Sequence, residues 1–261
     1  MKRDDRQQAI MDLLVTDGTV ELDALAERFA VSRMTIHRDL DELEGAGLLR
    51  KLRGGATIQS GTQFESDFRF RERQNASAKA TMSRAALDLI EPGMTVMIND
   101  GSMTAVLGQM LVQKRPLTVI TNNAAVIDTL RGENGITLIA LGGAYSAKYN
   151  AYLGKITEDA LCGLRADIAF ISTPAVMGLE TFHMEGDVVQ SKRRMMDQAT
   201  ARVLVVNHSR FGQAALYRLA GLDEFDHIIT DAAPSAEARA ALEAAGVPLT
   251  IASDDTQKAT A

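Results

Sequence analysis

The segment Val31–Leu43, VSRMTIHRDLDEL, constrains the fold most, because its residue pattern fits a helix with two different faces. A rotation of about 100° per residue places its apolar residues together on one side: Ile36, Leu40 and Leu43. Met34 and Arg38 then point to the opposite side. The pattern predicts a helix that packs on its own domain with one face and presents a polar face to a partner.

A shorter amphipathic helix is predicted directly before this segment. Its apolar residues keep the i, i+3, i+4, i+7 spacing of one helix face: Leu22, Leu25, Ala26 and Phe29. Ser32 suits the N-cap position, so the second helix starts sharply after a tight turn. Two short helices joined in this way form a helix-turn-helix arrangement, although an ordinary surface helix with a mixed-charge face fits the same pattern.

The residues that follow favour the helix-turn-helix interpretation. Gly45 and Gly47 end the second helix, and residues 48–58 have the pattern of a strand, a glycine turn and another strand. Three cations accompany the turn, namely Arg50, Lys51 and Arg53. Because cations of this kind contact phosphates, the segment is predicted to be a β-wing on a nucleic-acid backbone.

Four stretches, RQQAIMDLL, LDALAERFAVS, TIHRDLDEL and GLLRKLRGGA, resemble the winged helix-turn-helix of the DeoR family of bacterial transcription regulators. The resemblance covers residues 3–58 without an insertion. It implies a double-stranded DNA operator as partner and these DNA-contacting residues: Ser32, Arg33, Met34, Thr35, His37, Arg38, Arg50, Lys51 and Arg53. His37 stands where the family usually has a second arginine, which implies altered base or phosphate contacts on an unchanged fold.

Composition narrows the remaining possibilities. Cys162 is the single cysteine of the 261 residues, so the chain forms no internal disulfide, and the four dispersed histidines lack metal-ligand spacing. Neither a metal nor another cofactor is therefore expected. A net charge of −6 argues against indiscriminate DNA coating, whereas residues 48–79 carry seven Lys or Arg and only three Asp or Glu. No run is long and apolar enough for a membrane span, and MKRDDRQQ lacks a signal-peptide core, so a soluble cytoplasmic protein is expected.

From residue 79 onward, short apolar runs alternate with helical patterns. This alternation predicts an α/β domain with a mostly parallel sheet covered on both faces. The expected strands are 95–99, 117–121, 136–141, 168–171, 203–206, 227–230 and 248–251, and the expected helices are 80–89, 104–111, 124–130, 156–161, 188–199 and 235–245. The predicted organisation is a winged helix-turn-helix domain at 1–58, a linker at 59–78, the α/β domain at 79–252 and a disordered tail at 253–261.

The predicted strands of this domain end in polar, glycine-bearing loops at 99–104, 121–123, 142–143 and 207–212. Ligands of open α/β sheets bind outside the carboxyl ends of the strands. Glycines let backbone N–H groups approach an anion, and the hydroxyl groups of Ser102, Thr104 and Thr121 suit phosphate or sugar oxygens. Each loop alone fits routine turn chemistry, but four at one edge predict an anionic, polyhydroxylated ligand.

The motifs DGSMT, VITNNAAV, LGGAY, ADIAFIS, KRRMM and NHSRFG make residues 79–231 resemble the DeoR-type sensor domain, a relative of ribose-5-phosphate isomerase. The resemblance implies a phosphorylated sugar or polyol as effector and these effector-binding residues: Asp100, Gly101, Ser102, Thr104, Thr121, Asn122, Gly142, Gly143, Lys192 and Arg210. It also assigns Arg71 and Lys79 to the sensor domain. Three residues depart from the family pattern: Met103 replaces the usual Thr or Ser, Asn207 the usual Asp, and Arg210 the usual Lys. These departures imply an unusual ligand or a modest affinity.

Residues 183–192 leave two interpretations open. Either these residues close over the ligand, with Lys192 contacting a phosphate, or they form a solvated helix start whose acidic groups lie near the positive end of the helix dipole: His183, Met184, Glu185, Asp187 and Lys192. Elsewhere, Cys162 is expected in an apolar setting at a helix end, and His227 as a partly buried strand residue.

These observations predict a ligand-responsive repressor of a carbohydrate-utilisation operon, not an enzyme. A homodimer or homotetramer is expected, because one winged head buries too little surface for tight specific binding. One alternative is a sugar-phosphate isomerase fused to a DNA-binding head, with Asp100 or Glu185 as base and Arg210 as phosphate anchor. Another is a regulator or activator with a degenerate sensor, which Met103 and Asn207 favour.

Overall fold

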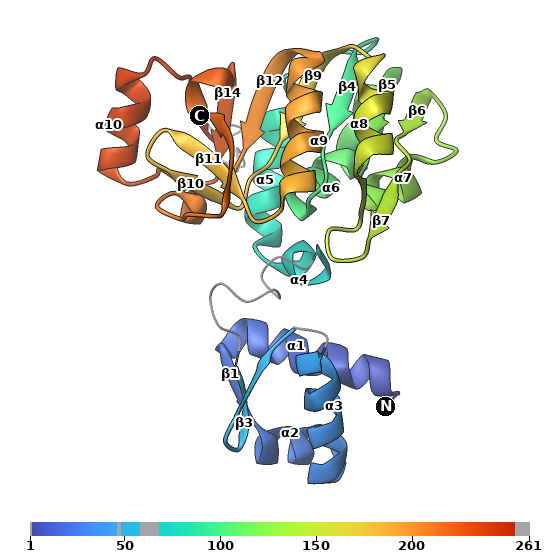
Figure 1. Ribbon diagram of the computed structural model, residues 1–261, viewed down its shortest axis with the longest axis vertical. Helices are drawn as coiled ribbons and strands as arrows, with labels where there is room; N and C mark the ends of the chain where they lie inside the picture. Colours follow the sequence, from blue (N-terminus) through green and yellow to red (C-terminus); the bar gives the residue numbers. More distant parts are fainter. Residues whose placement is uncertain (1, 46–47, 58–67, 254–261) are drawn as a thin grey trace, which may run out of the picture. The chain divides into compact units, whose positions relative to one another are not determined.

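The computed structural model describes residues 2–45, 48–57 and 68–253, and the remaining residues lie outside the described part. The chain forms two compact units, Met1–Gln74 and Asn75–Ala261 (Figure 1). None of the described helices combines the length and the apolar character that crossing a bilayer requires.

The described part of the N-terminal unit contains four helices and a three-stranded antiparallel sheet. Its elements are α1 (Arg3–Asp17), β1 (Thr19–Glu21), α2 (Leu22–Phe29), α3 (Arg33–Gly45), β2 (Arg50–Leu52), β3 (Gly55–Thr57) and α4 (Phe68–Arg73). The strand order is β1-β3-β2, so the two strands of the wing gain β1 as a third partner. The sequence did not predict β1, because three residues carry too little periodicity to reveal a strand.

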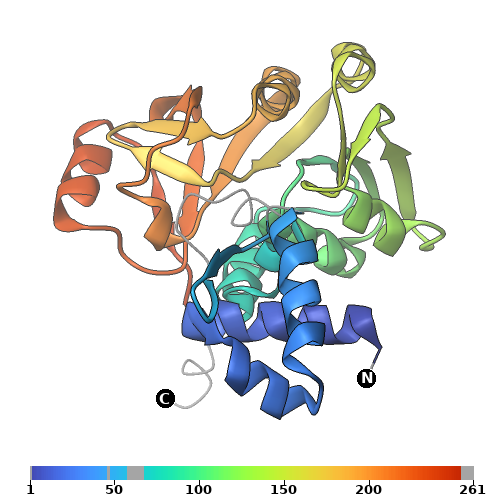
Figure 2. The same cartoon turned by 60° about the horizontal axis from the view of Figure 1, so that its bottom comes forward.

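One apolar core joins α1, α2 and α3 to the three-stranded sheet, and Figures 1 and 2 show these elements side by side. Its buried residues are Ile10, Met11, Leu14, Leu22, Leu25, Ile36, Leu40, Leu43, Leu49 and Ala56. The predicted orientation of α3 is therefore confirmed, and Met34 on its opposite side is 62% exposed. The predicted cap is confirmed as well, because Ser32 Oγ accepts the backbone N–H of Thr35 at 3.2 Å.

A seven-stranded sheet forms the centre of the C-terminal unit, with the strand order β15-β14-β12-β9-β4-β5-β6. All neighbouring strands in it run parallel, as predicted. The strands are β4 (Thr95–Ile98), β5 (Leu117–Thr121), β6 (Ile136–Ala140), β9 (Ala166–Ile171), β12 (Ala199–Val205), β14 (His227–Thr230) and β15 (Leu249–Ile251).

Helices cover both faces of this sheet (Figure 1). They are α5 (Ala76–Leu87), α6 (Ser102–Met110), α7 (Ala124–Leu130), α8 (Lys155–Cys162), α9 (Gly186–Asp197) and α10 (Ala236–Ala244), with the 3-10 turns η1 (Leu111–Lys114), η2 (His208–Arg210) and η3 (Leu222–Glu224). Along β4, Val96 and Ile98 join the apolar cluster that includes α5 and α6, whereas Met97 joins the cluster that includes α8 and α9. Alternate residues of one strand thus enter separate cores, which confirms the prediction of a doubly covered sheet.

Two antiparallel pieces beside this sheet are absent from the sequence-based prediction. The hairpin β7 (Ala144–Ser146) and β8 (Ala151–Leu153) follows β6, and a second sheet has the order β10-β11-β13. Its strands are β10 (Ala175–Met177), β11 (Glu180–His183) and β13 (Tyr217–Gly221). The helix expected at 80–89 begins earlier, at Ala76, so α4 and the start of α5 fall within the range 59–78 that was expected to be a linker.

Candidate functional site

The outward side of α3 presents side chains suited to DNA bases. Its exposed members are Met34, His37 and Arg38, with the half-buried Thr35 beside them. A guanidinium can donate two hydrogen bonds to guanine, and an apolar side chain can contact a thymine methyl group. Arg33, also exposed, forms an ion pair with Asp23 of α2 at 2.7 Å. This face therefore combines direct readout groups with one cation that links α2 to α3.

Acidic residues in the second half of α3 contact the wing. Asp41 forms an ion pair with Lys51 Nζ, and Glu44 Oε1 accepts the backbone N–H of Lys51 at 2.7 Å. Lys51 therefore attaches the wing to α3, which differs from the phosphate contact predicted for it. Arg50 and Arg53 are exposed on the wing, where cations can reach a backbone phosphate.

A buried ion pair, not anticipated from the sequence, holds the inward side of α3 against α1. Arg6 donates from Nε to Asp39 Oδ2 at 2.5 Å and from Nη2 to Asp39 Oδ1 at 3.1 Å. Gln7 adds a hydrogen bond to Glu42 Oε2 at 2.7 Å, one turn further along α3. A two-point contact of this kind fixes the rotation of α3 about its own axis, and with it the direction of the outward face.

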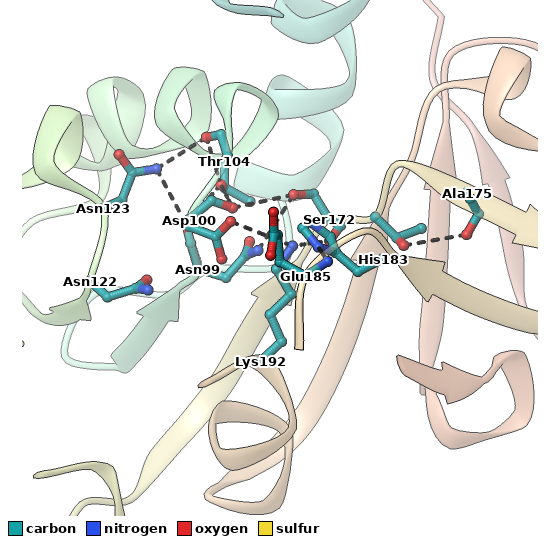
Figure 3. A network of polar contacts seen from close by, with 12 residues as sticks. Asn99, Asp100, Thr104, Asn122, Asn123, Ser172, Ala175, His183, Glu185 and Lys192 are labelled. Atoms are coloured by element: carbon teal, nitrogen blue, oxygen red, sulfur yellow. Dashed lines mark hydrogen bonds and ion pairs between the residues drawn. The ribbon is translucent and has the colours of Figure 1, made fainter. Parts of the chain in front are cut away.

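In the C-terminal unit, polar residues gather where the adjacent strands β5, β4 and β9 end (Figure 3). This polar cluster contains a buried ion pair. Lys192 Nζ lies 3.7 Å from Asp100 Oδ2, and both side chains are 2% exposed. Lys192 Nζ also donates to the carbonyl of Ser172 at 2.7 Å. The interpretation of residues 183–192 as a solvated helix start is therefore wrong for Lys192, because α9 buries this side chain beside Asp100.

Two of the predicted phosphate donors brace the loops instead. Thr104 Oγ1 donates to the carbonyl of Asn99 at 2.9 Å, and Thr121 Oγ1 donates to that of Ile98 at 2.7 Å. Both hydroxyl groups are fully buried and engaged with backbone carbonyls. Asn123, which sequence reasoning missed, caps α7 and donates from Nδ2 to the carbonyl of Gly101 at 3.0 Å.

Close backbone packing explains the glycines at this edge. Gly101 has φ 119°, and a Cβ there would lie 2.8 Å from Ser172 Oγ. Gly143 has φ 139°, and a Cβ there would lie 2.3 Å from Thr157 Oγ1. These two positions exclude other residues on conformational grounds. Ser102 starts α6 and is buried, and Gly142 accepts a hydrogen bond from Thr157 at 2.6 Å.

The hairpin β7–β8 brings further residues to this edge that the sequence did not reveal. Asn122 Nδ2 donates to the carbonyl of Tyr152 at 3.0 Å, which joins the end of β5 to the hairpin. Lys148 forms an ion pair with Glu185 at 2.8 Å, and the Tyr149 ring lies 5.5 Å from that of His183. These contacts connect two loops about 35 residues apart, a separation over which local patterns carry no signal.

The loop after β12 contains two of the three departures from the sensor-domain pattern, Asn207 and Arg210. Asn207 caps η2 and donates from Nδ2 to Asp231 at 2.8 Å, and Asp231 also accepts from the backbone N–H of His208 at 2.7 Å. Arg210 is half-buried, and its guanidinium forms no hydrogen bond or ion pair within the described part of the chain. The third departure, Met103, packs into the apolar cluster with α5, so its side chain belongs to the core.

The described residues hold no group of three or more His, Cys, Asp or Glu arranged to bind a metal ion. Cys162 is exposed, which differs from the apolar setting expected for it. His227 is half-buried in β14, as predicted, and its Nε2 lies 2.7 Å from Thr250 Oγ1.

Comparison with known proteins matches each unit to a family. Residues 6–62 match the family model of the DeoR-like helix-turn-helix domain, and residues 74–232 match that of the DeoR C terminal sensor domain. The HTH-type transcriptional regulator YgbI of Escherichia coli is 32% identical over 87% of this chain and 89% of its own length. The Escherichia coli glycerol-3-phosphate regulon repressor is 27% identical over 90% and 93% of the two chains. The L-fucose operon activator of Haemophilus influenzae is 30% identical over 87% and 91%.

Among solved structures, ribose 5-phosphate isomerase A from Methanocaldococcus jannaschii is 18% identical, with a TM-score of 0.39 over 53% of this chain and 55% of that one. A similarity at this level carries no argument about activity. The two domain matches, together with relatives aligned over most of their length, show that the chain is a DNA-binding transcriptional regulator of the DeoR family.

Proposed function

We propose that the chain represses a carbohydrate-utilisation operon and releases its DNA when a phosphorylated sugar or polyol binds. The proposal rests on two features that occur together in one chain. The helix-turn-helix unit exposes one face of α3, and the unit that matches the sensor family holds a buried polar cluster. One relative is named as a repressor and another as an activator. We assign repression to this chain by analogy with the repressor.

Within the N-terminal unit, we assign direct base contacts to Met34, His37 and Arg38, supported by their exposure on one side of α3. Arg50 and Arg53 on the wing supply phosphate contacts. The remaining predicted residues, Ser32, Arg33 and Thr35, lie at the N-terminus of the same helix, where backbone and side-chain groups can meet a phosphate.

Substitution of Arg38 tests the DNA part of this proposal. Arg38→Ala is expected to weaken binding to a duplex selected from a random pool by about 1–3 kcal/mol, because one base contact is lost. Arg3→Ala is the matched control, since it removes an equal charge from an exposed site on α1. Anisotropy titrations on selected and scrambled duplexes provide the readout. Equal affinity of Arg38→Ala and the unmodified protein for the selected duplex would contradict the assignment.

In the C-terminal unit, we place the effector at the carboxyl edge of β5, β4, β9 and β12. The buried charges at Asp100 and Lys192 support this position, because isolated buried charges are costly and gather at functional sites. Arg210 is the cation assigned to the effector's phosphate, since its guanidinium is not engaged by the described residues. A thermal-shift panel of sugar and polyol phosphates tests the site, with an Arg210→Ala variant expected to reduce every phosphate-dependent shift.

Sugar-phosphate isomerase activity is the second candidate, and the juxtaposition of Asp100 with Lys192 is the observation that favours it. A base must reach the substrate carbon, yet Asp100, one candidate base, faces Lys192 with its Oδ2. Glu185, the other candidate base, is held by Lys148. Incubation with ribose 5-phosphate, followed by NMR, is expected to leave the aldose unchanged, and formation of the ketose would overturn the repressor-only assignment.

We also propose a homo-oligomer that joins through the second sheet. Large apolar side chains are exposed at both ends of β11: Met177 and Leu179 near its start, and Leu216 and Tyr217 near its end. Exposed large apolar side chains commonly mark protein interfaces. A second copy also supplies the second DNA-binding head that operator half-sites require.

A further inference from the structure

Three buried oxygen atoms at the edge of the central sheet lack a hydrogen-bond donor from the described part of the chain. They are Asn99 Oδ1, Asp100 Oδ1 and Asn122 Oδ1. Their residues are at most 1% exposed, and they follow the neighbouring strands β4 and β5 (Figure 3). We refer to Asn99, Asp100 and Asn122 as the acceptor cluster.

Resting on the proposed function, we infer that the acceptor cluster receives the hydroxyl-bearing end of the effector and excludes its phosphate. A buried acceptor without a donor is unfavourable, so a group from outside the chain is needed to supply the missing hydrogen bonds. Sugar and polyol hydroxyl groups donate, whereas a phosphate dianion offers only acceptors. The cluster thus selects for several O–H groups at the inner end of the ligand.

Contacts on the other polar atoms fix the direction in which the cluster accepts. Asn122 Nδ2 donates to the Tyr152 carbonyl at 3.0 Å, so a flipped amide would set two acceptors against each other. Ser172 Oγ donates to the Asp100 carbonyl at 3.4 Å and so accepts from Asn99 Nδ2 at 3.5 Å, and Asp100 directs Oδ2 toward Lys192 Nζ. Each remaining oxygen can therefore accept but cannot donate.

The charges in the cluster also oppose a phosphate. Asp100 would repel it, and Lys192 Nζ already donates to the Ser172 carbonyl while facing Asp100. The pair is neutral as a whole, so it offers no net attraction for an anion. Since the three oxygens are closed to solvent, hydrogen bonds to the ligand form only after a local rearrangement, and they stabilise the rearranged state.

Asp100→Asn tests the inference because the two possible ligand orientations predict opposite signs. The new amide would keep its oxygen toward Lys192 and turn its NH2 group toward the ligand, which removes one acceptor. We expect the affinity for the best polyol phosphate to fall by about tenfold, corresponding to one lost hydrogen bond to a charged group. Unchanged or tighter binding, as expected if a phosphate lay beside Asp100, would overturn the inference.

The probes are glycerol 3-phosphate, ribitol 5-phosphate and mannitol 1-phosphate, each paired with the propyl, pentyl or hexyl phosphate of equal chain length, and inorganic phosphate. Isothermal titration of the unmodified full chain is expected to show that the best polyol phosphate binds at least tenfold tighter than its alkyl partner. Equal affinities within each pair would contradict the inference even if Asp100→Asn failed to fold.

Asp226→Asn is the matched control, because it makes the same substitution in a carboxylate that pairs with Arg202 just before β14, away from the acceptor cluster. We expect the control to change the affinity for the polyol phosphate by less than about twofold. A change as large as that of Asp100→Asn would show that the loss of any negative charge has this effect, and would overturn the inference. If a probe releases the DNA but Asp100→Asn binds it equally well, only the ligand orientation fails. If no probe alters DNA binding, the proposed function fails.

Discussion

His227 illustrates how one side chain links burial to pH. Its ring is half-buried in β14, and burial lowers the pKa of the imidazole from its ordinary value near 6.5. The unfolded chain therefore binds a proton more readily than the folded chain. The contribution of His227 to the free energy of unfolding is complete above pH 6.5. It decreases as the pH falls, first through the pKa of His227 in the unfolded chain and then through its pKa in the folded chain.

We expect His227→Gln to flatten the dependence of unfolding free energy on pH between 7.5 and 5.5, because glutamine can keep a hydrogen bond to Thr250 without titrating. Urea denaturation at both pH values measures this. His208→Gln serves as the control, since His208 is exposed. If His227→Gln lost as much stability on acidification as the unmodified protein, burial of this ring would not be the cause.

Single residues also mark the limit of sequence reasoning. The cap at Ser32 and the exposure of Met34 follow from local spacing and were predictable. The burial of Asp39 and Lys192 was not, because each depends on a partner far away in the chain, Arg6 and Asp100 respectively. Charged residues look alike in a sequence whether they are solvated or paired in a core.

Among the elements, α3 depends most on a contact outside its own pattern. Asp39→Ala is expected to destabilise the protein by about 3–5 kcal/mol, because it leaves Arg6 as an unpaired buried charge. The double variant Arg6→Met with Asp39→Leu is expected to regain most of that stability, since apolar side chains can replace a buried pair. Denaturation curves of the three variants measure the difference. If the double variant were as unstable as Asp39→Ala, the ion pair would contribute more to stability than the mutual neutralisation of its two charges.

Element prediction succeeded for the central sheet and failed for the small antiparallel sheets. The seven parallel strands and the order of their helices follow from short apolar runs that alternate with helical patterns. The strands β1, β7, β8, β10, β11 and β13 span only three to five residues, and β1 and β13 pair with strands far away in the chain. The carboxyl-edge location of the candidate site was predictable for the same reason as the sheet, whereas the hairpin residues Lys148 and Tyr149 were not.

At the scale of the whole molecule, the exposed apolar residues of the second sheet predict self-association. Leu216, which is 75% exposed, lies at the start of β13 beside Tyr217. We expect Leu216→Arg combined with Tyr217→Glu to shift the protein to monomers and to weaken operator binding, because two linked heads bind more tightly than one. Sedimentation velocity gives the mass. Ile156→Arg is the control, since Ile156 is similarly exposed on α8. An unchanged mass for the double variant would place the interface elsewhere.

The central claim is that effector binding in one unit controls DNA binding by the other. The most direct measurement is a fluorescence anisotropy titration of the full chain on a duplex selected from a random pool, repeated with each sugar or polyol phosphate at saturation. A coupling of about 1–3 kcal/mol between the two sites predicts a 5- to 150-fold loss of operator affinity with the correct effector. Operator affinity that stays constant with a phosphate that demonstrably binds the C-terminal unit would contradict the account.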